Sequence, residues 1–271
     1  MIYKPPIKEL KQKLKSEGFC FLPNIFNSNR TNIAYNALWD VIQGKYETGK
    51  PPDARFWEIG DDPNNIIKID KPHLCNKKIW DLITDNNFGQ WLANVTDAKR
   101  IQVWHSQVVW KPPCSGKKGI AGWHRDNQYW PFWTPEGVFT AWIALSDVNP
   151  ESGPVRYIQG SNQWNNIAGL DFFDKNISEQ YKILQDAQSD YKVINATIRK
   201  GQVSIHSSLT YHSSMQNTSQ SPRVGMVVHF CTDYAKRIPV NGELSRYLNC
   251  LEDTAISVSY THLTLPTNRE V

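Results

Sequence analysis

After Arg100 the chain becomes a series of short strand-like runs separated by residues that favour turns. The runs cover residues 101–110, 122–128, 138–148, 155–158, 192–198, 203–206, 210–213 and 223–231. Short apolar and aromatic runs bounded by Gly, Pro, Ser and Asn are typical of β-sandwiches and barrels. The pattern therefore predicts a mainly β fold for residues 100–235.

Residues 1–99 have a different pattern, which predicts flanking helices. Helical spacing of apolar residues predicts helices over 7–16, 28–42, 77–83 and 88–95, the first ending at Gly18 and the second capped by Ser28 or Asn29. Brief strands are expected at 19–22 and 65–70. We expect residues 1–257 to form a single domain, with a helical N-terminal region over 1–99 and a barrel over 100–235.

Composition narrows the classes of protein to which the chain can belong. It has 271 residues and a formal charge of +4, and its basic residues are scattered, which argues against nucleic acid as a partner. Five dispersed cysteines are typical of reduced thiols. No signal-peptide pattern and no apolar run long enough to cross a bilayer is present, so the sequence predicts a cytoplasmic protein without a membrane partner.

Within the predicted strand 122–128, His124 and Asp126 are separated by one residue. Side chains at i and i+2 of a strand point to the same face, so an imidazole and a carboxylate could converge on a divalent metal. A pair of this kind also arises by chance as polar residues on a surface, so it needs a third ligand before it predicts a metal site.

Two more histidines, His206 and His212, precede Arg223 near the end of the β region. Two histidines and one carboxylate on one face leave three octahedral positions open, as in non-heme Fe(II) oxygenases. A buried Arg223 could pair its planar guanidinium with the carboxylate of an organic acid. His206 competes with His212 as third ligand, but we interpret it as a histidine packed beside the site.

Several ordered motifs resemble the phytanoyl-CoA dioxygenase family. They are Trp-His-Ser-Gln-Val-Val-Trp-Lys-Pro-Pro at 104–113, Trp-His-Arg-Asp at 123–126, Tyr-Trp-Pro-Phe at 129–132, the run at 141–161, and His-Ser-Ser-Met-Gln-Asn at 212–217 with Arg223 eleven residues after His212. The resemblance covers residues 17–232, and the order of the motifs is more specific than any one of them.

The resemblance implies a fold, cofactors and a reaction. The fold would be a double-stranded β-helix, a cupin-like jelly-roll barrel with flanking helices, holding Fe(II) and using 2-oxoglutarate and O₂ as co-substrates. The expected reaction is hydroxylation of an unactivated C–H bond of a small molecule or acyl substrate, with release of succinate and CO₂. The iron ligands and catalytic residues would be His124, Asp126 and His212. The co-substrate contacts would be Arg223, Ser214, Gln107, Trp142 and Lys68.

The chain departs from the family pattern at two positions. Asn162 stands where the family usually has a histidine, so we expect it to serve structure and not iron. Gln107 stands where relatives vary, which we relate to substrate. Related halogenases have a small residue where this chain has Asp126, so its carboxylate favours hydroxylation over halogenation.

The sequence leaves the outcome of the reaction and the identity of the substrate open. The same oxidant could serve desaturation, ring formation or demethylation, or the barrel could bind a metal or ligand without catalysis. The loops 44–65 and 164–188 and the aromatic run 129–133 are the places where we expect selection of a small-molecule substrate. Three lysines in 111–118 could attract a phosphate or acyl-CoA, or could form a solvated basic loop. The oligomeric state is left open.

The last residues form an unusual segment. Val-Ser-Tyr-Thr-His-Leu-Thr-Leu-Pro-Thr at 258–267 matches one translated frame of a common transposon-based sequencing adapter. We therefore expect 258–271 to be a non-native tail and discount His262 as a ligand. Resequencing the locus from unfragmented DNA tests this, and a native gene that encodes the tail would contradict it.

Overall fold

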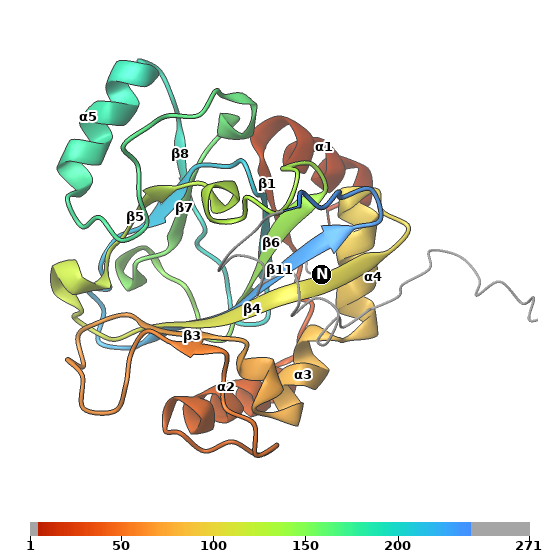
Figure 1. Cartoon of the computed structure of the whole chain (residues 1–271), viewed down its shortest axis with the longest axis vertical. Helices are drawn as coiled ribbons and strands as arrows, with labels where there is room; N and C mark the ends of the chain where they lie inside the picture. Colours follow the sequence, from red (N-terminus) through yellow and green to blue (C-terminus); the bar gives the residue numbers. More distant parts are fainter. Residues whose placement is uncertain (1–4, 240–271) are drawn as a thin grey trace, which may run out of the picture.

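The computed structural model describes residues 5–239, which form two antiparallel β-sheets surrounded by helices (Figure 1). The larger sheet has seven strands in the order β1-β9-β6-β11-β4-β3-β2, and the smaller has four in the order β5-β10-β7-β8. This confirms the predicted mainly β fold of the jelly-roll type. Within the described residues the two sheets are separate hydrogen-bonded units. The predicted non-native tail lies outside the described residues.

Each predicted run overlaps a strand, although β5 and β8 are shorter than predicted and β2 lies in a predicted loop. Their bounds are β1 Phe19–Leu22, β2 Ala54–Arg55, β3 Ile67–Asp70, β4 Ile101–Lys111, β5 Ala121–His124, β6 Val138–Ala144, β7 Val155–Ile158, β8 Val193–Asn195, β9 Val203–Ser207, β10 His212–Ser214 and β11 Arg223–Thr232. Because β1, β2 and β3 join the larger sheet, the mainly helical N-terminal region contributes strands to the same sheet as the region 100–235.

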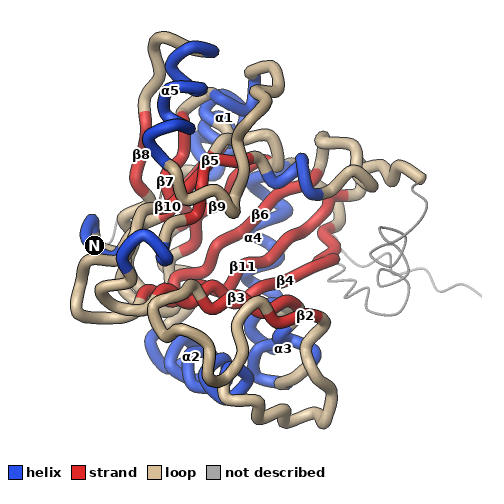
Figure 2. Tube along the Cα trace, turned by 60° about the vertical axis from the view of Figure 1, so that its left-hand side comes forward, coloured by secondary structure: helices blue, strands red, loops and turns tan. Residues whose placement is uncertain are grey.

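Four helices pack against the larger sheet and one lies beside the smaller sheet (Figures 1 and 2). Their bounds are α1 Ile7–Glu17, α2 Ser28–Ile42, α3 Lys77–Ile83, α4 Asn86–Thr96 and α5 Ile177–Ala187. The N-cap of α2 is Asn27, whose side chain accepts a hydrogen bond from the Arg30 amide, so the prediction of Ser28 or Asn29 as the cap was wrong by one or two residues. No helix in the described range is long and apolar enough to cross a membrane.

The alternation of side chains along β11 assigns one face of the larger sheet to the helices. Val224, Met226 and Val228 lie in the main hydrophobic core, which also contains buried residues of α1 to α4. Arg223, Val227 and His229, which alternate with them along the strand, line a cavity on the opposite face of the sheet. Period-two alternation thus sends apolar residues to the helices and functional residues to the space between the sheets.

A register shift interrupts the pairing of β4 with β11. His229 pairs with His105, whereas the next residue, Phe230, pairs with Val103, so Trp104 is an extra residue in β4. A bulge of this kind changes which face the following side chains take. As a result Trp104 and His105, although adjacent in sequence, both line the same cavity.

Candidate metal centre

His124 and His212 are directly opposed across two neighbouring strands. His124 ends β5, His212 begins β10, and the two are cross-strand partners. Their ring centroids are 4.1 Å apart, and both residues are buried. With Asp126 they form a cluster in which one ligand atom from each residue lies within 4.8 Å of the others. The structure thus brings together the three metal ligands expected from the sequence.

Hydrogen bonds at Nδ1 fix how the two imidazoles face the centre. His124 Nδ1 donates to the Gly122 carbonyl at 2.8 Å, and His212 Nδ1 donates to the Thr210 carbonyl at 2.9 Å. Each Nε2 is then left without a hydrogen and free to bind a metal. A carbonyl that orients the remote nitrogen is the usual support for a metal-binding histidine.

The backbone reaches Asp126 by a route different from the predicted strand. The strand ends at His124, Arg125 is still extended, and Asp126 opens the short 3₁₀ helix η3 at Asp126–Tyr129. The Arg125 guanidinium turns away and donates to the carbonyls of Ser161 and Trp164. The expected strand 122–128 was therefore too long, but the extended residue between the ligands still places both of them on one side.

Two hydrogen bonds to one oxygen decide which oxygen of Asp126 faces the histidines. Thr140 Oγ1 donates to Oδ2 at 2.6 Å, and His206 Nε2 donates to the same atom at 3.0 Å. The other oxygen, Oδ1, lies 3.6 Å from His212 Nε2 and 3.9 Å from His124 Nε2. One carboxylate oxygen and two imidazole nitrogens therefore point to a common place, and His206 orients the carboxylate.

The charges of this cluster suit a divalent cation. Burial raises the pKa of Asp126, but the His212 and His206 imidazoles lower it more, and the result lies well below the usual value. Burial, together with the neighbouring His124 and His206, lowers the pKa of His212 well below its usual value. The carboxylate is therefore ionised and the imidazole neutral near pH 7, which are the forms that bind metal.

A small cavity of about 90 Å³, here called the inner cavity, extends from this cluster to Arg223. Arg223 is only 1% exposed, and its Nε and Nη1 atoms have no hydrogen-bond partner anywhere in residues 5–239. Burial lowers the pKa of Arg223 to about 10. A buried cation with unused donors is costly unless an anion binds it, so the inner cavity has the properties of a carboxylate site.

Ser214 lines the inner cavity, and Lys111 lies behind it. Lys111 is fully buried and pairs in register with Arg223 across β4 and β11. Its Nζ donates to Ser214 Oγ at 2.8 Å and to the Met215 carbonyl. Because Ser214 accepts from the lysine, its own hydroxyl hydrogen is free to point into the cavity. Burial, followed by Arg223, lowers the pKa of Lys111 well below its usual value, so positive charge here lacks a counter-charge.

The other predicted co-substrate residues differ in their positions. Trp142 lines the inner cavity, and the Arg223 guanidinium carbon lies 5.1 Å from the centre of its ring. Gln107 lines both the inner cavity and a larger one, and its Nε2 lies 3.3 Å from His105 Nε2. Lys68 lines only the larger of these two cavities, where its Nζ is 3.6 Å from Asp70 Oδ1. Its role as a co-substrate contact stays a prediction.

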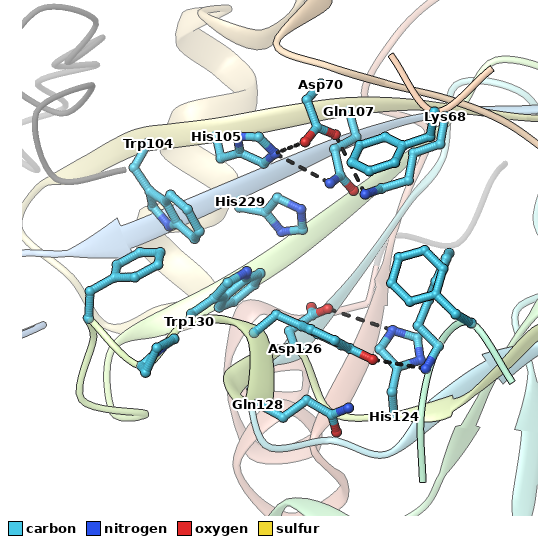
Figure 3. A pocket seen from close by; sticks show the side chains of 16 residues that line it. Lys68, Asp70, Trp104, His105, Gln107, His124, Asp126, Gln128, Trp130 and His229 are labelled. Carbon is cyan, nitrogen blue, oxygen red and sulfur yellow. Dashed lines mark hydrogen bonds and ion pairs between the residues drawn. The ribbon is translucent and has the colours of Figure 1, made fainter. Parts of the chain in front are cut away.

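The larger cavity, here called the outer cavity, has a volume of about 430 Å³ and opens over the same ligands (Figure 3). His124 and Asp126 lie on one side of it, and Asp70, His105 and Gln107 lie across from them. Its aromatic lining comprises Phe56, Trp104, Tyr129, Trp130, Phe132, Phe172 and Phe173. Both loops expected to contact substrate thus contribute, 44–65 through Phe56 and 164–188 through Phe172 and Phe173.

Four other residues singled out in the sequence, Trp130, Trp133, Asn162 and Lys118, have defined surroundings in the structure. Of the aromatic run 129–133, Trp133 packs in a hydrophobic cluster with Trp104, whereas Trp130 reaches the outer cavity. Asn162 donates to the Lys15 carbonyl at 3.1 Å, in keeping with a structural use. In the basic loop, Lys118 is exposed and pairs with Asp62.

Sequence reasoning missed Lys111, Thr140 and Asp70. The lysine was assigned to an exposed loop, although it continues the two-residue alternation of Gln107 along β4. That alternation was the available signal, but it required knowing where the strand ends. Thr140 carries no motif, and it is found only through its bond to Asp126.

Comparison with known proteins agrees with this geometry. The sequence model of the family described as phytanoyl-CoA dioxygenase (PhyH) matches residues 16–225. The chain belongs to the phytanoyl-CoA dioxygenase family. The peroxisomal phytanoyl-CoA dioxygenase of Homo sapiens is 25% identical over 145 residues, which is 52% of this chain and 43% of that protein. A probable phytanoyl-CoA dioxygenase of Caenorhabditis elegans is 21% identical over 211 residues, or 77% of this chain and 61% of that protein. The chain thus spans roughly half the length of these relatives.

Solved structures share the fold of this family member. The non-heme alpha-ketoglutarate-dependent carbocyclase SnoK from nogalamycin biosynthesis superposes with a TM-score of 0.69 at 19% identity, covering 88% of this chain and 94% of that one. EctD from S. alaskensis with 2-oxoglutarate and 5-hydroxyectoine gives a TM-score of 0.65 at 16% identity, covering 86% and 78%. At these identities the likeness is one of fold.

The buried histidines predict how the stability of the metal-free protein depends on pH. Burial lowers the pKa of His229 to about 3, and burial also lowers the pKa of His73 to about 3. Both favour the neutral form when folded, so the stability they contribute is complete above about pH 6.5 and is lost as the pH falls towards 3. Each should cost roughly 1.4 kcal/mol per pH unit in that window. Urea unfolding at pH 7.5 and 5.5 measures this, and equal stability at the two values would contradict it.

Proposed function

We propose that this chain is an Fe(II)- and 2-oxoglutarate-dependent dioxygenase that hydroxylates an unactivated C–H bond of a small molecule. The observation that carries the proposal is the inner cavity, which joins a two-histidine, one-carboxylate cluster to the unpartnered buried guanidinium of Arg223. A site of this composition has a place for a metal and for a dianionic keto acid on the same face.

The residues present fit both groups. His124 Nε2, His212 Nε2 and Asp126 Oδ1 would hold the iron, because their other atoms are engaged by hydrogen bonds. Two histidines and one carboxylate leave positions open, as Fe(II) oxygenases require. Bound iron, with 2-oxoglutarate and O₂ as co-substrates, would supply the oxidising power for hydroxylation, one oxygen atom of O₂ entering the substrate and the other entering succinate, with release of CO₂.

The protein itself binds and orients the co-substrate. Arg223 would pair with the distal carboxylate through its guanidinium, which has unused donors, and Ser214 would donate its hydroxyl to the same group. Trp142 packs beside the guanidinium and limits its movement. Charge-assisted bonds in a closed, apolar cavity are stronger than in water. Gln107, which lines both cavities, and Lys68, which lines the outer one, remain proposed contacts.

The outer cavity would hold the primary substrate. It shares His124 and Asp126 with the inner cavity, so a molecule in it lies beside the metal ligands. The carboxylate of Asp126 occupies the position that a halide would need, which favours hydroxylation over halogenation. Desaturation, ring formation and demethylation would use the same residues, and the pose of the substrate would decide between them.

A non-catalytic barrel that binds a metal or a ligand is the alternative from another class. Such a protein would have no need for a buried, unpartnered Arg223 beside a complete set of metal ligands. An uncompensated buried charge lowers stability, so it is expected to persist only where an anion regularly binds.

The proposal predicts a weak visible charge-transfer band when Fe(II) and 2-oxoglutarate are added without oxygen. The His212→Ala variant should lose this band because one of the three ligand atoms is removed. His73→Gln, which changes a buried histidine outside both cavities, should retain it. Absence of the band in the unaltered protein, or an unchanged band in His212→Ala, would contradict the assignment.

Lys111→Met should weaken 2-oxoglutarate binding about 10-fold. The substitution removes the hydrogen bond that orients the Ser214 hydroxyl. Loss of a hydrogen bond from a charged group costs roughly 1.5 kcal/mol. Calorimetric titration of the Mn(II)-loaded protein under argon measures the dissociation constant. Lys117→Met, on the neighbouring loop, is the matched control and should bind like the unaltered protein. Equal affinities for both variants would show that Lys111 plays no role in the site.

A further inference from the structure

One wall of the outer cavity is polar, and the carboxylate of Asp70 in this wall has no role in the proposed chemistry. Asp70 ends β3, is 6% exposed, and lines the cavity across from Asp126 (Figure 3). His105 stands beside it on β4, and its ring stacks on that of His229 at 5.4 Å between centroids. Neither the metal ligands nor the carboxylate site at Arg223 requires a second buried acid here.

The Asp70 carboxylate is loosely held by its neighbours. Its Oδ2 lies 3.5 Å from His105 Nε2, and its Oδ1 lies 3.6 Å from Lys68 Nζ. Both distances exceed the usual range of a hydrogen bond, about 2.7 to 3.2 Å. No group in the described range of the chain donates a hydrogen bond to Oδ1. The carboxylate therefore keeps acceptor capacity in a buried place.

The carboxylate is charged despite its burial. Burial raises the pKa of Asp70, but His105 and Lys68 lower it more, and the result lies below the usual value. An ionised, buried carboxylate is stabilised by a further donor, and Asp70 keeps a small exposed part, 6%, on the cavity from which a donor can arrive.

Aromatic rings form the rest of the wall and favour a compact ring-bearing ligand. Trp104 and Trp130 meet edge to face, at 4.9 Å between centroids and 89° between planes. Phe132 contacts Trp104 in the same manner at 5.6 Å. The cavity volume of about 430 Å³ lies towards the lower end of the range for small-molecule sites, roughly 300 to 1,000 Å³.

We infer that the outer cavity takes a compact, ring-bearing molecule that donates an N–H or O–H hydrogen bond to Asp70, and that it rejects plain hydrocarbon chains. The inference rests on the proposed function only in taking the outer cavity as the substrate site. It assigns to this chain a substrate class different from the acyl thioester in the names of its relatives.

The free-energy cost of removing water from a buried acceptor explains this selectivity. An alkyl chain in the cavity would remove water from the Asp70 carboxylate and return no hydrogen bond. Sites built to bond a hydroxyl or amine reject analogues that lack the donor by roughly 10⁴ to 10⁵-fold.

The test uses probes that share one ring and differ in the donor. Cyclohexanol and cyclohexylamine carry a donor, and cyclohexanone carries only an acceptor, so the three are titrated into the full chain and followed by tryptophan fluorescence and unfolding temperature. Phytanoyl-CoA is the fourth probe. We expect the two donor probes to bind at least 10-fold more tightly than cyclohexanone, and phytanoyl-CoA to bind no more tightly than cyclohexanone.

Two variants of Asp70 make the result specific. Asp70→Leu should abolish the preference for donors, whereas Asp70→Asn, which keeps an acceptor oxygen, should retain it for cyclohexanol and lose the advantage of the amine. Asp190→Asn, an exposed acid outside the cavity, should behave like the unaltered protein.

Three results would overturn the inference. The first is an equal response, or no response, to all four probes. The second is binding of phytanoyl-CoA or cyclohexanone at least as tight as that of the donor probes. The third is a preference for donor probes that survives in Asp70→Leu. Because these measurements need no turnover, their failure is distinct from loss of the iron and 2-oxoglutarate band, which tests the proposed function.

Discussion

The pairing of β5 with β10 is the constraint on which the site depends. It sets His124 opposite His212, so the two imidazoles meet before any metal arrives. A slip of one residue would turn one of them to the other face of the sheet. The adjoining pair of β10 with β7 places Ser213 and Ser214 in register with Arg156 and Val155, which fixes β10 from its other side.

The carboxylate of Asp126 is held by the opposite sheet. Thr140 comes from β6 and His206 from β9, both in the larger sheet, whereas the two histidine ligands come from the smaller one. The candidate metal centre therefore forms only when the two sheets pack face to face. The same packing divides the space between the sheets into an inner cavity closed by Arg223 and an outer cavity lined by aromatic rings. The two cavities share Gln107, His124, Asp126, Phe172 and His229. A metal ion bound to His124 and Asp126 would thus contact one molecule in the inner cavity and another in the outer cavity.

The sequence was most informative where a residue type has few other uses. His124, Asp126, His212 and Arg223 were found from an ordered series of motifs, and the structure gathers all four around one cavity. The positions of most strands and helices followed from periodicity, because apolar residues alternate along β11 and repeat every three to four residues along α1.

Features that depend on contacts between distant segments could not be predicted in the same way. The burial of Lys111 follows from its register with Arg223, which sequence spacing does not specify. The two hydrogen bonds to Asp126 arise 14 and 80 residues away. Trp104 lines the same cavity as its neighbour His105 because of a bulge in β4, and no local pattern marks that bulge. Local sequence thus identified the candidate ligands, whereas tertiary packing determined their orientation and the shape of the pockets.

The most direct test of the central claim is an anaerobic crystal structure with Mn(II) in place of iron and 2-oxoglutarate. The account predicts anomalous density between His124, Asp126 and His212, and a keto acid whose distal carboxylate contacts Arg223 and Ser214. Metal bound at His206 or His229 in place of these ligands, or a co-substrate that leaves Arg223 without a carboxylate, would contradict it.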